Sequence, residues 1–104
     1  MSKTAAGNIK GTNSGTISGK FVEDDGTEHL CTGTIDPATI FVASEAVLTY
    51  SGFLLGKHTY EGTVGKTAIA LTQDNGYTIT GNLDDPAASR TTVTGSLSWS
   101  TRQA

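Results

Sequence analysis

A five-residue pattern recurs five times along the chain: an apolar residue, any residue, a glycine, any residue and a second apolar residue. Successive side chains of a β-strand point to opposite faces, so the three marked positions of each copy would share one face. The positions between them hold Ser, Thr, Lys, Glu and Asn, which suit a face in water. The pattern therefore predicts five strands, each with a glycine in the middle of its apolar face. The copies occupy residues 17–21, 31–35, 60–64, 79–83 and 93–97.

Turn residues separate the copies and set the approximate length of each strand. Asn and Gly accept the positive φ of tight turns, so Asp24-Asp25-Gly26 and Asp74-Asn75-Gly76 are hairpin signals. Proline has no N–H to donate, so Asp36-Pro37 and Asp85-Pro86 are expected to end strands. The expected strands are residues 14–22, 28–35, 39–50, 58–64, 67–73, 76–83 and 90–99, with a further short strand near 7–11.

These strands describe an all-β fold, and a length of 104 residues fits a single domain. The 18 threonines support this fold class, because a β-branched side chain favours strands over helix interiors. The short connections indicate a single small antiparallel up-and-down β-barrel of about seven to eight strands. A β-sandwich is the alternative. The domain is expected to span residues 1–104, with frayed ends at about 1–7 and 102–104.

The stretch at residues 39–50 admits two interpretations. Its β-branched and aromatic residues, among them Ile40, Val42 and Val47, favour a strand. However, Asp36-Pro37 resembles a helix N-cap followed by proline in the first turn, which would make residues 37–48 a helix. The strand is the preferred interpretation. It fixes the direction of every later strand, and therefore which side chains meet at each end of the barrel.

The repeated glycines have two uses on the inner face of a barrel. Glycine permits the bend that a closed barrel requires of its strands. It also leaves room at mid-height, either for a large neighbouring side chain or for a ligand. A filled interior is the expected case, because small barrels are usually packed solid by side chains.

Extending three copies of the pattern by two residues toward the N-terminus adds His29, His58 and Tyr77 to the same face. If the ambiguous stretch is one strand, the strands that carry these residues run in the same direction, so all three lie at one end of the barrel. The antiparallel neighbours end there with Phe21 and Trp99. Barrel mouths that combine apolar walls with a few polar groups are common small-molecule sites. The residues expected to line a ligand pocket at this rim are His29, His58, Tyr77, Trp99, Phe21 and Tyr60.

No catalytic or metal-binding motif emerges from the sequence. His29 and Cys31 share a face and, with His58, could supply three metal ligands, but Cys31 begins an apolar motif and is expected to be a buried, inert thiol. Residues 62–67 resemble the end of a phosphate-binding loop but lack its first glycine and the helix that should follow. The acidic residues at 23–28 match no EF-hand loop and indicate a solvated turn. Neither a metal nor another cofactor is expected.

Charge and hydropathy narrow the range of partners. The formal net charge is −3, and the seven Lys and Arg residues are scattered. Binding to nucleic acid or to an anionic membrane surface requires a basic face, so neither partner is expected. No apolar run approaches the roughly 20 residues of a membrane span. Without an apolar signal-peptide core near the N-terminus, the chain as given is expected to be cytoplasmic, or secreted if it is a processed form.

The preferred functional interpretation is a non-enzymatic binding module with a small apolar or aromatic-lined pocket at one rim, and a small molecule or carbohydrate as its partner. Two alternatives stay open. Thr-rich strands with few charges leave weakly protected edges, which favours a structural or adhesive homo-oligomer that could bind carbohydrate. A small-barrel enzyme that mainly orients an apolar substrate needs no conventional triad, so it is the other alternative.

Overall fold

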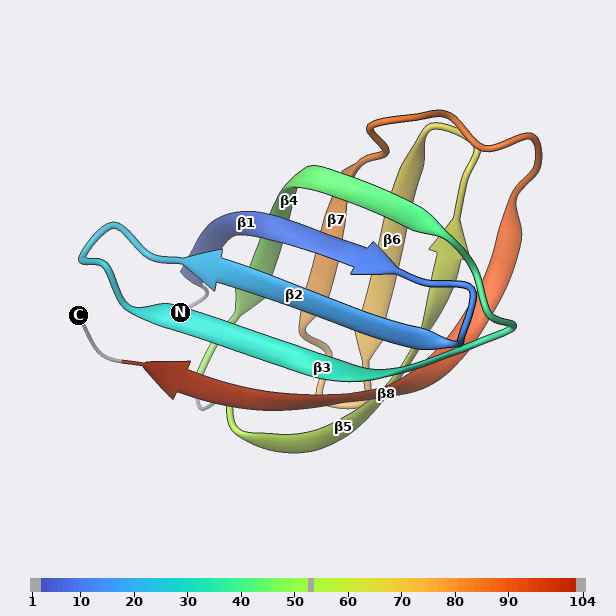
Figure 1. Ribbon diagram of the computed structural model, residues 1–104. Helices are drawn as coiled ribbons and strands as arrows, with labels where there is room; N and C mark the ends of the chain where they lie inside the picture. The colour runs from blue at the N-terminus through green and yellow to red at the C-terminus, as the bar shows by residue number, and fades with distance from the viewer. Residues whose placement is uncertain (1–2, 53, 103–104) are drawn as a thin grey trace.

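The chain folds into eight antiparallel β-strands that close into one barrel (Figure 1). The computed structural model describes residues 3–52 and 54–102. The expected all-β antiparallel barrel is confirmed. Residues 41–50 form a strand, so the strand interpretation of 39–50 is confirmed and a helix at 37–48 is excluded. The strands are β1 (Lys3–Gly11), β2 (Thr16–Val22), β3 (Glu28–Asp36), β4 (Phe41–Tyr50), β5 (Gly56–Val64), β6 (Ala68–Gln73), β7 (Thr78–Asn82) and β8 (Thr91–Arg102).

The strand order around the barrel is β1-β2-β3-β8-β5-β6-β7-β4. β4 returns to pair with β1 and also borders β7, whereas β8 returns to pair with β5 and also borders β3. Each half of the chain is therefore a Greek key, in which the fourth strand lies beside the first. The up-and-down connectivity expected from the short loops holds only within β1–β3 and β5–β7. Elsewhere the order differs from an up-and-down barrel, because three connections join strands that are not neighbours. These connections are residues 37–40, 51–55 and 83–90.

β1 begins nearer the N-terminus than the sequence suggests. Residues 1–7 are expected to fray, but residues 3–7 pair with β4, from Lys3 opposite Tyr50 to Gly7 opposite Ala46. This pairing exists because β4 runs back along the whole of β1, which a simple meander would not provide. At the other end β8 continues to Arg102, while residues 1–2 and 103–104 lie outside the described residues.

The inside of the barrel is filled by aliphatic and aromatic side chains. Buried residues alternate with exposed ones along much of the sheet, as in β6, where Ile69, Leu71 and Gln73 point inward. Phe21 and Leu97 are 0% exposed and belong to one continuous core cluster. The filled interior, which was the expected case, leaves the ends and the outer wall of the barrel as places for a ligand.

The repeat glycines lie where neighbouring strands approach too closely for a β-carbon. A β-carbon on Gly33 would overlap the carbonyl oxygen of Ser96 on β8. A β-carbon on Gly95 would overlap the carbonyl oxygen of Thr34 on β3. Each of the two strands therefore needs a glycine where a carbonyl oxygen of the other strand lies. The hydroxyl of Tyr60 lies 2.9 Å from the position of a Gly95 β-carbon and donates a 2.7 Å hydrogen bond to the Thr34 carbonyl. These two glycines thus admit backbone and a tyrosine side chain rather than a ligand.

We expect Gly33→Ala to destabilise the barrel by about 3 kcal/mol, because the added methyl group forces the backbones of β3 and β8 apart. Urea unfolding followed by circular dichroism measures this loss. Thr32→Ala is the matched control, since Thr32 is the exposed neighbour on the same strand, and it should cost about 1 kcal/mol at most. If Gly33→Ala unfolds at the same urea concentration as the wild type, the close approach of β3 and β8 does not constrain the fold.

Candidate functional site

One end of the barrel, which we call the rim, gathers the starts of the odd-numbered strands and the ends of the even-numbered strands. The start of β1 and the end of β8 both lie there (Figure 1). The odd strands bring His29 on β3, His58 on β5 and Tyr77 directly before β7. The even strands bring Phe21 near the end of β2 and Trp99 near the end of β8. Five of the six residues expected at a pocket therefore lie at this end, while Tyr60 lies one inward position deeper on β5.

A pocket of about 320 Å³ opens at the rim, between the start of β1, the β2–β3 turn and the connection that follows β4. We call it the rim pocket. Leu54 and Leu55 give it an apolar side; Leu54 is 3% exposed, whereas Leu55 is 56% exposed. Its other side carries hydroxyl, imidazole, carboxylate and ammonium groups. The lining residues are Lys3, Glu23, Thr27, His29, Tyr50, Gly52, Leu54, Leu55 and Thr101.

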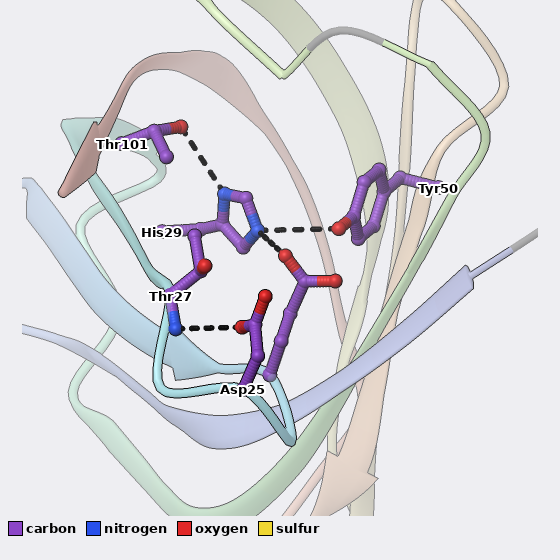
Figure 2. Close-up of polar contacts among 6 residues, drawn as sticks. Asp25, Thr27, His29, Tyr50 and Thr101 are labelled. Carbon is purple, nitrogen blue, oxygen red and sulfur yellow. Dashed lines mark hydrogen bonds and ion pairs between the residues drawn. The ribbon is translucent and has the colours of Figure 1, made fainter. Parts of the chain in front are cut away.

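His29 joins three walls of the rim pocket through hydrogen bonds (Figure 2). Its Nε2 lies 2.7 Å from Glu23 Oε2 and 3.2 Å from the Tyr50 hydroxyl, and its Nδ1 lies 3.2 Å from Thr101 Oγ1. A carboxylate only accepts, so the Nε2–H donates to Glu23, while the Thr101 hydroxyl can either donate or accept. The imidazole also packs edge-on against the Tyr50 ring, with 5.2 Å between centroids. His29 is 5% exposed, and both of its nitrogens are already hydrogen-bonded.

The electrostatics of the rim pocket keep Glu23 charged and Tyr50 protonated at neutral pH. Hydrogen bonds from Tyr50 and His29 lower the pKa of Glu23 below its usual 4.5. Burial, followed by the hydrogen bond to Glu23, raises the pKa of the Tyr50 hydroxyl. The turn that carries Glu23 is held by Asp25, whose Oδ1 accepts a 2.9 Å hydrogen bond from the Thr27 amide. The pocket therefore presents an ionised carboxylate and an uncharged phenol at fixed positions.

The other predicted residues lie beneath or beside the rim pocket. The Trp99 Nε1–H donates a 2.7 Å hydrogen bond to Gln73 Oε1, and the Phe21 and Trp99 ring centroids are 6.1 Å apart in the core. The Tyr77 ring lies 6.1 Å from that of Tyr50. His58 lies outside the pocket lining and bonds to Asp74 and to the Leu55 carbonyl, so the structure does not bring the two histidines together.

Strict alternation along β4 predicts the wrong face of the strand for Tyr50, a residue of the rim pocket. Counting in steps of two from the buried Phe41 puts Tyr50 on the outer face. A β-bulge breaks this count, because Ile9 of β1 pairs with Ala43 while Gly7 pairs with Ala46. The extra residue shifts the alternation, so that residues 46, 48 and 50 point inward. The signal in the sequence is the pair of polar residues at 44–45, which interrupts the alternation.

Seven further residues of the lining also lie outside the set predicted from sequence, among them Glu23, Leu54 and Thr101. Glu23 belongs to the acidic stretch that the sequence indicates as a solvated turn, but its carboxylate turns in toward His29. Thr101 lies two residues after Trp99 on β8, directly before the residues 102–104 that were expected to fray. Neither residue belongs to a repeated pattern, so their roles depend on contacts between strands.

The thiol of Cys31 lies in the core and not in the lining of the rim pocket. Cys31 is 1% exposed, and burial raises the pKa of its thiol to about 12, so the thiolate needed for nucleophilic attack is scarce. Among residues 3–52 and 54–102, no three or more His, Cys, Asp or Glu side chains are grouped so that they could hold a metal ion. The same residues include no helix that is long and apolar enough to cross a membrane.

A scan against protein-family models and searches of curated proteins and of solved structures find no match for this chain. The geometry of the rim and the chemistry of its side chains therefore carry the functional argument.

The lowered pKa of Glu23 predicts how stability depends on pH. The carboxylate stabilises the folded state above its unfolded pKa, and this contribution is lost as the pH falls through the lower folded value. We expect Glu23→Gln to cost about 1 kcal/mol near neutral pH, where the charged hydrogen bonds are complete. The variant should then lose less stability than the wild type below about pH 4.5.

Urea unfolding at a series of pH values measures this difference. Asp24→Asn makes the same change of net charge in the same turn and is the matched control. Equal loss of stability on acidification in the wild type and in Glu23→Gln would contradict the role given to Glu23.

Proposed function

We propose that this protein is a non-enzymatic binding module that takes a small molecule in the rim pocket. The observation that carries the proposal is the pairing of an apolar side, Leu54 and Leu55, with a fixed carboxylate and phenol, Glu23 and Tyr50. Small-molecule sites typically combine apolar walls with a few polar groups that set orientation. The filled barrel beneath the pocket supplies a rigid floor for it.

The polar groups of the pocket suit binding better than catalysis. A general base needs a nitrogen or oxygen free to take a proton from the substrate. Both His29 nitrogens are already hydrogen-bonded, Cys31 is buried, and the lowered pKa of Glu23 makes its carboxylate a weak base. The network of Glu23, His29, Tyr50 and Thr101 instead fixes the side chains of one wall, which lowers the entropy cost of binding.

The ligand expected here is small and amphipathic. An apolar part would lie against Leu54 and Leu55, and a hydrogen-bond donor or a positive group would face Glu23, whose carboxylate is ionised at neutral pH. A pocket of about 320 Å³ is near the lower end of the range for small-molecule sites, so a ligand of one or two rings fits better than a long chain.

A fragment screen by protein NMR tests this proposal. Amphipathic amines and matched neutral analogues should shift the amide signals of Thr27, Gly52 and Thr101, and should change the fluorescence of Trp99 beneath the pocket. Tyr50→Phe should weaken binding by about three- to tenfold, because it removes a polar group of the pocket lining but keeps the ring.

Tyr77→Phe is the matched control, since Tyr77 lies against Tyr50 but is outside the pocket lining. It should leave the affinity unchanged. Amide shifts confined to the outer wall of the barrel, or no shift with any member of the screen, would overturn the proposal.

A further inference from the structure

His58 lies outside the rim pocket but is hydrogen-bonded to one of its walls. Its Nε2 lies 3.1 Å from the backbone carbonyl oxygen of Leu55, a pocket residue. Its Nδ1 lies 2.8 Å from Asp74 Oδ1, in the turn between β6 and β7. The imidazole thus connects the last residues of the β4–β5 connection to a turn on a different part of the rim.

Both partners of His58 are acceptors. A backbone carbonyl has no proton to donate, and an ionised carboxylate has none either. Asp74 is ionised at neutral pH, because hydrogen bonds from His58 and from the backbone of Thr59 lower the pKa of its carboxyl group. Both hydrogen bonds therefore form together only when both ring nitrogens carry a proton. A neutral imidazole would turn a lone pair toward one of the two oxygens.

Among residues 3–52 and 54–102, three elements contribute the groups that face His58. From the β6–β7 turn, the charged group that faces the ring is Asp74. From β8, the residue opposite His58 is the apolar Leu97. From the β4–β5 connection, the contact is the Leu55 carbonyl. The imidazole and the carboxylate are about one quarter and one half exposed, so protons exchange freely with solvent.

We propose that His58, Asp74 and the Leu55 carbonyl form a proton-dependent latch on the wall of the rim pocket. Protonated His58 holds the Leu55 backbone to the Asp74 turn, and loss of the proton releases one of the two hydrogen bonds. Imidazole is the side chain whose proton number usually changes nearest neutral pH, so pH is the variable that tests the latch.

The latch acts on an exposed part of the pocket wall. Leu55 is the pocket wall that is 56% exposed, whereas Leu54 beside it is buried. Release of the Leu55 carbonyl would therefore loosen the apolar side of the pocket while the His29 network keeps the polar side in place. The consequence for ligand affinity rests on the proposed function; the latch itself does not.

Hydrogen exchange of the ligand-free protein tests the latch. After correction for the intrinsic pH dependence of exchange, protection at residues 54–56 should be about five- to tenfold higher near pH 5.5 than near pH 8. Protection of the core strand β8 should not change. Nitrogen NMR of the imidazole should show two ring N–H groups on His58 at the lower pH.

Asp74→Asn gives the sharpest test, because an amide can donate as well as accept. Its NH₂ group can donate to Nδ1 of a neutral imidazole while Nε2–H still donates to Leu55, so protection should stay high at both pH values. His58→Gln, which does not titrate, should remove the pH dependence. Unchanged protection across pH in the wild type, or a wild-type response in Asp74→Asn, would overturn the latch.

A ligand that binds the rim pocket should have a dissociation constant that changes with pH in the wild type and not in Asp74→Asn. If no ligand binds but the exchange results hold, the latch stands and the proposed function fails. If a ligand binds but exchange does not respond to pH, the proposed function stands and the latch fails.

Discussion

The close approach of β3 and β8 is the constraint on which the rest of the structure depends. These strands come from different halves of the chain, and their pairing joins the two Greek keys on one side of the barrel. Gly33 and Gly95 allow it, because the carbonyl oxygens of Ser96 and Thr34 occupy the space that their β-carbons would take. The antiparallel pairing of β3 with β8, together with that of β4 with β7, places the start of every odd-numbered strand at the same rim.

Much of this arrangement is local and can therefore be predicted from the sequence. Alternation with a period of two identifies the inner face, and the glycine and asparagine turns separate the strands. Together they give seven of the strands, the direction of each and the end at which His29 and His58 enter. Within β1–β3 and β5–β7 the directions require no further knowledge, because strands joined by tight turns must alternate in direction.

The remaining features depend on contacts between distant parts of the chain. A short loop can join neighbours or cross the end of a barrel, so loop length did not reveal that β4 pairs with β1 and β7. The bulge opposite Gly7 and Ile9 turns Tyr50 inward, and it exists only in relation to the partner strand. Glu23 becomes a pocket residue because its turn lies over His29. The composition of the candidate site therefore follows from topology more than from the repeat.

The two histidines of the rim show why position alone does not determine what a residue can do. The same pattern places both at the start of an odd strand, but their partners differ in chemistry. The Thr101 hydroxyl can donate or accept, so His29 keeps its hydrogen bonds whether it is neutral or charged. Asp74 and the Leu55 carbonyl can only accept, so His58 needs its second proton to hold both. One imidazole therefore fixes the polar wall of the pocket at any pH near neutrality, while the other makes the apolar wall depend on a proton.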